Sequence, residues 1–193
     1  MDSAPGRKQL SHTRIVEVAA RAIRRAGFQG LGVGDIMKEA GLTHGGFYAH
    51  FASRDALMAE ALAHAGRESA RRLEAAQSEA PEAGSPLRAL LDSYLSARHM
   101  RHPETGCAVA ALACEMPRQS PMVRQAAAER VRGLVAKVRE ALPPDTDASA
   151  APVIASQMIG ALQMARALEA DEGLALLAQV RASLLSQHDR AAP

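Results

Sequence analysis

Gly41-Leu-Thr-His-Gly-Gly-Phe-Tyr-Ala-His-Phe51 is the stretch that decides the fold, because it combines a helix end, a turn and a second helix. Gly41 tolerates the left-handed backbone that often ends a helix, and Thr43 supplies an N-cap hydroxyl for the next one. Gly45 and Gly46 each cost this short helix about 1 kcal/mol relative to Ala, so it would hardly form alone. Two helices joined by a short turn with Gly are typical of a helix-turn-helix, whose second helix enters the major groove of DNA. The stretch therefore predicts a DNA-binding protein.

The composition of the 193-residue chain limits its class. Hydrophobic residues make up 48% and charged residues 23%, which is typical of a globular protein. Long stretches with apolar residues at helical spacing, separated by Pro and Gly, predict an all-α fold. Apolar runs stay below the roughly 18 residues that cross a bilayer, and the polar N-terminus lacks the apolar core of a signal peptide. We therefore expect a cytoplasmic protein with no membrane contact.

Positive charge is concentrated near the N-terminus, although the formal net charge is only +2. Residues 1–25 contain six Lys or Arg against two Asp or Glu, whereas residues 67–193 contain fifteen of each. This excess lies beside the helix-turn-helix, where a DNA phosphate backbone would attract it. A solvated helix face would carry the same excess, so the charge alone leaves both interpretations open.

Apolar periodicity and helix breakers predict about nine helices. A flexible arm over residues 1–10 precedes a first helix, which Ser11 or Thr13 caps and Gly27 ends. The rest of an N-terminal unit comprises short helices over residues 35–40 and 43–50 and a fourth helix from Ser53 or Asp55 to about residue 76. Residues 77–86 form a linker rich in Pro, Gly and Glu. Five more helices are expected over residues 87–101, 105–116, 122–142, 151–168 and 171–186.

The N-terminal unit also matches a known pattern in spacing and residue type. It reads Gly27-Phe28-x-Gly30, Val33-x-Asp35-Ile36 and Ala40-Gly41-Leu42-Thr43-x-Gly45-x-x-Tyr48-x-His50-Phe51-x-x-Arg54-x-x-Leu57. In this the chain resembles the TetR family of bacterial transcriptional repressors. The resemblance implies a DNA-binding domain over residues 9–69, with its helix-turn-helix at residues 32–51, and a ligand-binding and dimerisation domain over residues 70–193. Gly32 and Gly34 depart from the family, which often has polar residues there, and Arg54 stands where Lys is commoner.

Eight residues are predicted to contact DNA. Thr43 and His44 carry polar groups suited to base edges or phosphate, and the bare backbone at Gly45 and Gly46 lets the duplex approach closely. The resemblance implies that Tyr48 and His50 contact the phosphate backbone of DNA. The full predicted set is Arg14, Thr43, His44, Gly45, Gly46, Tyr48, His50 and Arg54, the last as a phosphate contact at a helix start.

The C-terminal part is predicted to contain a ligand cavity and a dimer surface. The resemblance implies the cavity, and five Met with Tyr94 as the one aromatic residue predict aliphatic, Met-rich walls. We expect an apolar or amphiphilic effector in contact with Tyr94, Arg98, His99, Met116, Met158 and Leu162, with His102 as a further polar candidate. A two-fold operator requires a two-fold protein, and the last two helices are the expected dimer surface, through residues such as Met158, Leu162, Leu177 and Leu184. The prediction is a homodimeric repressor that a small-molecule effector releases from a palindromic operator.

Other chemistries remain as alternatives. Glu60, His64 and Glu68 share a helix face and mimic metal ligands, although ion pairs with nearby arginines explain them more simply. Cys107 and Cys114 are seven residues apart and are expected on one helix face. The alternative they suggest is a regulator that responds to thiol oxidation or to a metal and uses the same DNA-binding scaffold. The glycines at positions 30, 32 and 34 lack the preceding strand of a nucleotide-binding loop. A helical enzyme and a dimeric interaction module are the remaining rivals, but without GxSxG or HExxH motifs we expect no enzyme, no metal and no cofactor.

Overall fold

The computed structural model describes residues 6–30, 32–79 and 84–189, and all regular secondary structure in these ranges is helical. The all-α prediction is confirmed. In chain order the elements are α1 (Arg7–Ala26), α2 (Val33–Glu39), the 3-10 helix η1 (His44–Ala49), α3 (Arg54–Glu79), α4 (Pro86–Tyr94), α5 (Ala97–Arg101), η2 (Pro103–Thr105), α6 (Ala108–Leu112), η3 (Met116–Arg118), α7 (Pro121–Ala141), α8 (Ala150–Ala167) and α9 (Ala170–His188). None of the helices in the described ranges is long and apolar enough to span a membrane.

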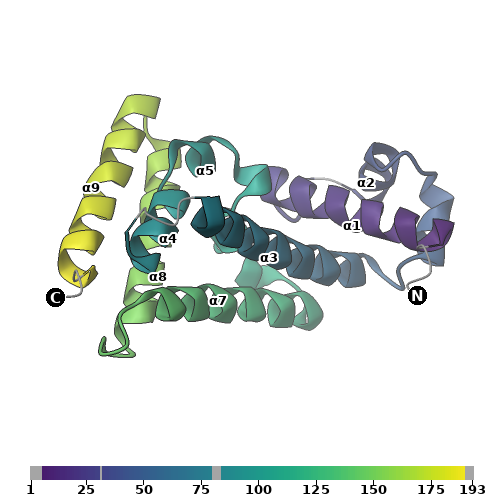
Figure 1. Ribbon diagram of the computed structural model, residues 1–193. Coiled ribbons are helices and arrows are strands. Elements are labelled where there is room, and N and C mark those ends of the chain that lie inside the picture. The colour runs from purple at the N-terminus through teal and green to yellow at the C-terminus, as the bar shows by residue number, and fades with distance from the viewer. Residues whose placement is uncertain (1–5, 31, 80–83, 190–193) are drawn as a thin grey trace.

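The helices form an elongated molecule whose two chain ends lie at opposite ends (Figure 1). α1 and α2 form one end, and the packed pair α8 and α9 forms the other. The 26-residue helix α3 runs from the first end into the centre, where α7 lies alongside it (Figure 1). The predicted domain boundary at residues 69 and 70 therefore falls inside α3, which belongs to both halves.

Two apolar clusters hold these helices together. The first fills the N-terminal unit around Ile15, Phe28 and Phe47, and it continues to Leu112 of α6 and Val123 of α7. The second fills the C-terminal half and includes Leu87, Leu91, Val138, Ile154, Met158 and Leu162. Because α6 and α7 contribute to the first cluster, the N-terminal unit packs directly on the C-terminal half.

The first two helices begin earlier than predicted. α1 starts at Arg7, so neither Ser11 nor Thr13 caps it, and residues 7–10 belong to the helix rather than to an arm. α2 starts at Val33, because Asp35 Oδ2 accepts a hydrogen bond from the Gly32 N–H (3.1 Å) and secures the first turn. A glycine at this N-cap position supplies no hydroxyl, so the carboxylate makes the only side-chain bond at this helix start among the described residues.

Two of the five predicted C-terminal helices have different bounds in the structure. Residues 87–101 form two helices, because the Ser96 hydroxyl accepts a hydrogen bond from the His99 N–H (3.2 Å) and starts α5 anew. Residues 105–116 contain the five-residue helix α6 flanked by turns and 3-10 segments. Cys107 precedes α6 and Cys114 follows it, so the prediction that both lie on one helix face is wrong. α7, α8 and α9 begin and end within two residues of the prediction.

Candidate nucleic-acid interface and ligand cavity

A few backbone and apolar contacts hold the helix-turn-helix. Gly41 has φ +71°, and the Leu42 N–H donates to the carbonyl of Met37 (2.9 Å), which turns the chain away from α2. Phe47 anchors η1 in the core, with its ring 5.6 Å from that of Phe51. Residues 43–49, named the recognition segment, consist of Thr43 at the N-cap position and the 3-10 helix η1, where a short helix over residues 43–50 was predicted.

The recognition segment presents its polar side chains to solvent. Thr43, His44 and Tyr48 are exposed, and 76% of Tyr48 is accessible. Thr43 stands at the N-cap position of η1 without a side-chain cap bond, so the predicted cap is absent. A hydroxyl, an imidazole and a phenol therefore face outward together, as groups that contact phosphates or base edges must.

Gly45 has no steric reason within the chain to be glycine. A Cβ atom at this position would meet no heavy atom within 4 Å, and one at Gly46 would make only ordinary contacts, the nearest at 3.7 Å. Neither residue has a positive φ. Because a glycine costs a helix about 1 kcal/mol relative to Ala, both residues weaken η1 without improving its packing. The bare backbone here is suited to close approach by something outside the chain.

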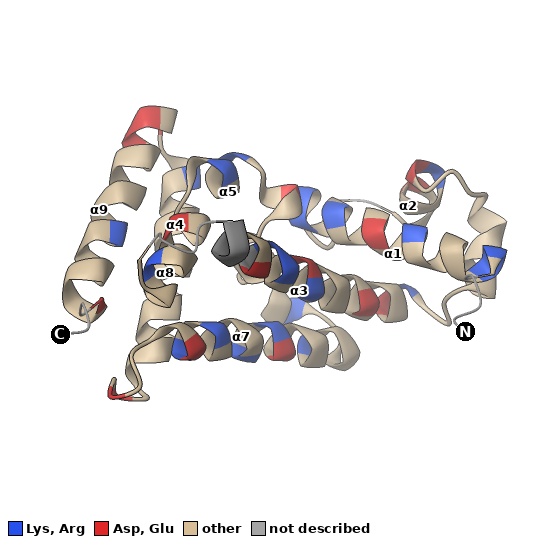
Figure 2. Cartoon of the chain, in the orientation of Figure 1, with Lys and Arg blue, Asp and Glu red and all other residues tan. Residues whose placement is uncertain are grey.

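Cationic side chains flank the motif. Arg14 is exposed on α1, and its Nη2 lies 3.4 Å from the point that a Cβ of Gly41 would occupy. α1 as a whole carries six Lys or Arg and one acidic residue, Glu17 (Figure 2). This distribution creates a positive potential beside the recognition segment.

Two predicted contact residues also have roles inside the N-terminal unit. The ring of His50 lies 6.1 Å from that of His12, and its Nδ1 is buried without a hydrogen-bond partner among the described residues. Burial, followed by the charges of His12 and Lys8, lowers the pKa of His50, which favours the neutral ring. Arg54 donates a hydrogen bond to the carbonyl of Phe28 and ties the start of α3 to the turn after α1. Any phosphate contact by Arg54 would use its other N–H groups.

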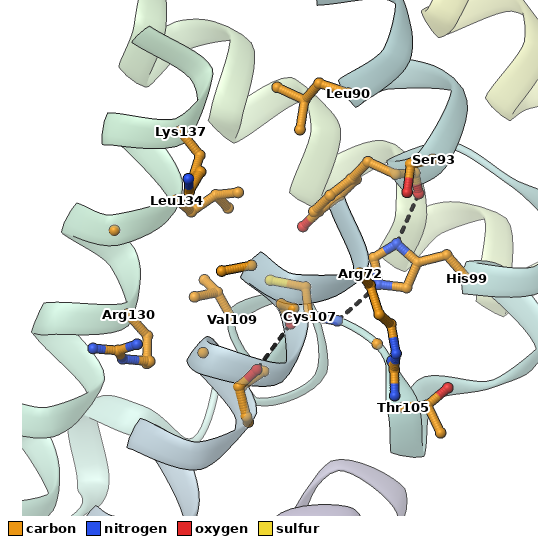
Figure 3. A pocket seen from close by; sticks show the side chains of 18 of the residues that line it. Arg72, Leu90, Ser93, His99, Thr105, Cys107, Val109, Arg130, Leu134 and Lys137 are labelled. Atoms are coloured by element: carbon orange, nitrogen blue, oxygen red, sulfur yellow. Dashed lines mark hydrogen bonds between the residues drawn. The ribbon is translucent and has the colours of Figure 1, made fainter. Parts of the chain in front are cut away.

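A cavity of about 450 Å³ lies between α3, α4, α5 and α7. Figure 3 shows Arg130, Leu134 and Lys137 of α7 on one side of it and Arg72 and His99 on the other. Cys107 and Val109 close the space between these two walls (Figure 3). A cavity of this size is within the range that binds small organic molecules.

The structure divides the predicted ligand contacts into two groups. Tyr94, Arg98, His99 and the further candidate His102 line the cavity. Met116, Met158 and Leu162 do not, because they are buried between packed helices at 6%, 0% and 0% exposure. Among the described residues no Met lines the cavity, so the expectation of Met-rich walls is wrong. The Met side chains fill gaps in the cores instead.

His99 joins two backbone segments in the cavity wall through its ring nitrogens. Its Nδ1 lies 2.7 Å from the carbonyl of Tyr94 and its Nε2 lies 2.8 Å from the backbone nitrogen of Cys107. The carbonyl only accepts and the N–H only donates, so the ring is neutral with its proton on Nδ1. Burial lowers the pKa of His99 to about 4, which agrees with a neutral ring. Both nitrogens are already used, so the predicted role of His99 as a polar ligand anchor is not available without breaking a bond.

Three cationic residues of the cavity wall were not predicted from the sequence. They are Arg72, Arg130 and Lys137. The last two share one face of α7 with Leu134, at the i, i+4, i+7 spacing, and this spacing was visible in the sequence. What the sequence did not indicate is that this face turns toward α3 and α4.

A buried arginine connects the N-terminal unit to the cavity wall. Arg24 of α1 is 3% exposed, and it donates to the carbonyls of Ala20 (2.9 Å) and Gly106 (2.9 Å) and to Glu68 Oε2 (2.7 Å). Glu68 also pairs with Arg72 of the cavity wall. Burial alone would raise the pKa of Glu68, but the hydrogen bond and charge of Arg24, helped by Arg72, lower it. Residues 24, 68, 72, 99, 106 and 107 with their mutual bonds are called the interior network below.

Ion pairs account for two of the three suspected metal ligands. Glu68 is bonded to Arg24 and Arg72, and Glu60 Oε2 lies 2.7 Å from His12 Nε2. Within the described ranges no group of three His, Cys, Asp or Glu side chains is placed to hold a metal ion.

A second link joins the two halves at the turn before α2. Glu115, between α6 and η3, accepts a hydrogen bond from the Phe28 N–H (3.0 Å). Gly27 has φ +78°, and a Cβ there would lie 2.5 Å from Glu115 Oε1. The carboxylate can reach this backbone only because residue 27 is glycine.

Comparison with known families agrees with this geometry. Residues 15–61 match the model of bacterial regulatory proteins of the tetR family, and residues 83–180 match a tetracyclin repressor-like C-terminal domain. The chain belongs to the TetR family. Its members are DNA-binding transcription regulators, so the helix-turn-helix prediction is confirmed at this level. A search of curated proteins gave no match.

Solved structures share the TetR fold over almost the whole chain. The reduced form of NemR from E. coli has a TM-score of 0.74 at 20% identity, covering 95% of this chain and 98% of that one. A regulator from Chloroflexus aurantiacus has a TM-score of 0.72 at 23% identity and 93% and 96% coverage. One from Agrobacterium tumefaciens has a TM-score of 0.74 at 18% identity and 94% and 98% coverage. At these identities the similarity concerns the fold alone.

The TetR chain also has an exposed apolar stripe on α8. Val153, Met164 and Leu168 are 56%, 59% and 39% exposed, and they share one face with Gly160, where a Cβ would meet nothing within 4 Å. Four of the residues predicted for a dimer surface, Met158, Leu162, Leu177 and Leu184, are instead buried within the chain at 0% to 2% exposure, whereas the predicted Gly160 and Val180 are partly exposed. For these four residues the prediction is wrong, because they pack in the core of their own chain.

Proposed function

We propose that this TetR-family regulator is a homodimeric repressor that binds a palindromic operator and leaves it when a small molecule occupies the cavity. The observation that carries the DNA-binding part is the recognition segment, in which Gly45 has free space around it and Tyr48 is exposed. Such a surface is suited to a partner that seats against the backbone. The predicted contacts at Arg14, Thr43, His44, Gly46, His50 and Arg54 belong to the same proposal.

The dimer would form through α8 and α9. A two-fold operator has half-sites about 34–36 Å apart or a multiple of this, and it requires two recognition segments in a fixed relation. The exposed stripe of Val153, Met164 and Leu168 offers apolar area, and Gly160 lets a partner helix approach closely. The regulator would act in the cytoplasm, with no catalytic activity.

Release by an effector requires a link from the cavity to the DNA-binding unit. Arg72 lines the cavity and pairs with Glu68, which accepts from Arg24 of α1. A ligand that draws Arg72 away from Glu68 would change the partners of a buried residue in the DNA-binding unit. The effector would thus favour the arrangement in which it binds better, and operator affinity would fall by the same coupling free energy.

The thiol-responsive alternative has one observation in its favour. Cys107 lines the cavity and Cys114 is exposed. A thiol in the wall would react with an oxidant that enters the cavity. This alternative predicts that peroxide releases operator DNA from the native protein but not from the Cys107→Ser variant, whereas the proposed small-molecule effector acts on both.

The experiment is a gel-shift assay with DNA from upstream of the gene, combined with sedimentation of the free protein. We expect a dimer that binds this DNA, and a Tyr48→Ala variant that binds about 5- to 150-fold more weakly, because one lost contact costs about 1–3 kcal/mol. Met122→Ala is the control, since Met122 is also a large exposed side chain (53%) but lies on α7. A folded dimer that binds no upstream DNA at low salt, or equal binding by the native and Tyr48→Ala proteins, would contradict the proposal.

A further inference from the structure

The cavity wall combines positive charge with an apolar lining. Four permanent cations line it, Arg72, Arg98, Arg130 and Lys137, and none of its lining residues in the described ranges is Asp or Glu. We propose that the cavity binds a small amphiphile with one anionic head group, and that the effector belongs to this class. The assignment of an effector rests on the proposed function, whereas the binding site itself does not.

Arg72 is paired with Glu68, but the other three cations have weak competing partners or none. The carboxylates nearest to Arg130 and Lys137 are Glu129 (3.9 Å) and Glu140 (3.3 Å), whose side chains are 53% and 66% exposed. Such exposed pairs are weak and exchange readily with water or with another anion. Arg98 forms no ion pair within the described part of the chain. An entering anion would therefore displace little.

Arg130 is held in place with part of its donor capacity unused. A Cβ at Gly66 of α3 would lie 1.8 Å from Arg130 Nη1, so the guanidinium lies directly against the α3 backbone. Its Nε is buried and has no hydrogen-bond partner among the described residues. A guanidinium fixed in this way is preorganised to donate to a carboxylate or phosphate oxygen.

A second polar group of the cavity wall has only a weak hydrogen-bond partner. Tyr94 is 7% exposed and lines the cavity, and the Cys107 thiol, a weak hydrogen-bonding group, is the one side chain of the described residues that bonds to its buried hydroxyl. Because a thiol is a weak partner, the hydroxyl keeps the capacity to donate to a polar atom of a ligand. Burial, with the Cys107 thiol close by, raises the pKa of Tyr94 well above its usual value, so the group remains a neutral donor.

The remaining wall is suited to a hydrocarbon body. Leu90, Val109 and Leu134 face the space in Figure 3, and Ala65 and Ala108 complete this lining. The volume of about 450 Å³ excludes large polyanions and accommodates one medium-length chain or a small ring system. Head group and body together define the amphiphile.

The test uses decanoate, decyl phosphate and 1-decanol as probes in calorimetry with the full-length protein. We expect at least one of the two anions to bind roughly tenfold or more tightly than 1-decanol, and its affinity to fall as salt rises. Comparison of decanoate with decyl phosphate distinguishes a carboxylate from a phosphate head group. Equal or tighter binding of 1-decanol, or no binding of either anion by folded protein, would overturn the inference.

Variants locate the head group. Arg130→Gln is expected to lower the affinity for the anion about tenfold and to leave that for 1-decanol unchanged, since one charge-assisted hydrogen bond is lost. The matched control is Arg132→Gln, because Arg132 is an exposed arginine of the same helix that does not line the cavity. Tyr94→Phe, which removes only the hydroxyl, is expected to weaken anion binding several-fold without loss of stability. An Arg132→Gln effect as large as that of Arg130→Gln would refute the site.

The two proposals fail separately. If the protein binds upstream DNA but neither anion, the anion site is refuted and the proposal of a repressor stands. If the protein binds the anions but no DNA, the proposal of a repressor is refuted and the anion site stands. A protein that binds both, with operator affinity unchanged by saturating anion, refutes the assignment of the anion as effector.

Discussion

The recognition segment and the interior network use their polar residues in opposite ways. In the recognition segment, Thr43, His44 and Tyr48 are exposed and Gly45 is free of neighbours. In the interior network, Arg24 is 3% exposed, with three hydrogen-bond acceptors, and both nitrogens of His99 are bonded. The fold depends mainly on the second group, whereas the first contacts the core through the ring of Tyr48, which lies 5.2 Å from that of Phe47.

This difference predicts which mutations should change stability and which should change DNA affinity. Removing a bonded buried group leaves its partners unsatisfied and lowers the free energy of unfolding. Removing an exposed group with no internal contacts leaves stability almost unchanged and affects only what the protein binds. Stability and DNA affinity should therefore respond to different residues, although the two regions are joined through α1.

The largest effect is expected at Arg24. Arg24→Met leaves Glu68 and the Gly106 carbonyl without their buried donor, and we expect a loss of about 3 kcal/mol in the free energy of unfolding. Arg25→Met is the control, because Arg25 pairs with Glu39 at 3.2 Å with both side chains substantially exposed, and such a surface pair contributes about 1 kcal/mol or less. Urea denaturation measures both. Equal losses for the two variants would remove the distinction between the interior network and the surface.

The N-terminal unit was predictable because its signals are local. Gly41 adopts the positive φ expected at the end of a helix, and Phe47 and Phe51 are buried as the apolar spacing indicates. The helix starts at Arg7 and Val33 were not predicted, since one lacks a side-chain cap bond and the other uses Asp35 with a glycine cap. The eight proposed DNA contacts remain predictions of the sequence.

The C-terminal half was less predictable because its cavity depends on packing between distant segments. Met and Leu residues at helical spacing indicate apolar helix faces, but they do not reveal which face meets the core and which meets a cavity. Met158 and Leu162 were assigned to the ligand and to the dimer surface, and they are fully buried in the core instead. The contact of Arg24 with Gly106 spans 82 residues of sequence, and no local pattern predicts such a bond.

The next largest effect is a loss of folding stability at acid pH, which tests whether the His99 ring is held neutral by its two hydrogen bonds. The pKa of His99 is about 4 in the folded chain, below its ordinary value of 6.5, so protons bind the unfolded chain first. Stability is then unaffected above pH 6.5 and falls as the pH drops below it, by about 2 kcal/mol between pH 7.5 and pH 5 from this group alone. We expect His99→Gln to be less stable at pH 7.5 but to lack this part of the acid loss.

The measurement for His99 is urea denaturation at several pH values between 7.5 and 5. His102→Gln removes an exposed imidazole from the same region and should keep the pH dependence of the native protein. If the acid loss is the same in the native and His99→Gln proteins, His99 is not held neutral by the wall, and the contrast between the bonded interior and the open recognition segment weakens.

The smallest effect, and the sharpest separation of the two regions, is expected at Gly45. A methyl group there meets no atom of the chain, and an Ala is favoured over Gly in a helix, so Gly45→Ala should raise the free energy of unfolding by up to about 1 kcal/mol. The same methyl would hold the backbone away from a duplex, and we expect operator affinity to fall about tenfold, which corresponds to about 1.4 kcal/mol. Opposite signs in denaturation and gel-shift assays would mean that the glycine is kept for the partner and not for the fold. Unchanged DNA binding by a more stable variant would instead indicate that the duplex does not approach residue 45, and the contact surface would have to move toward Tyr48 and Arg14.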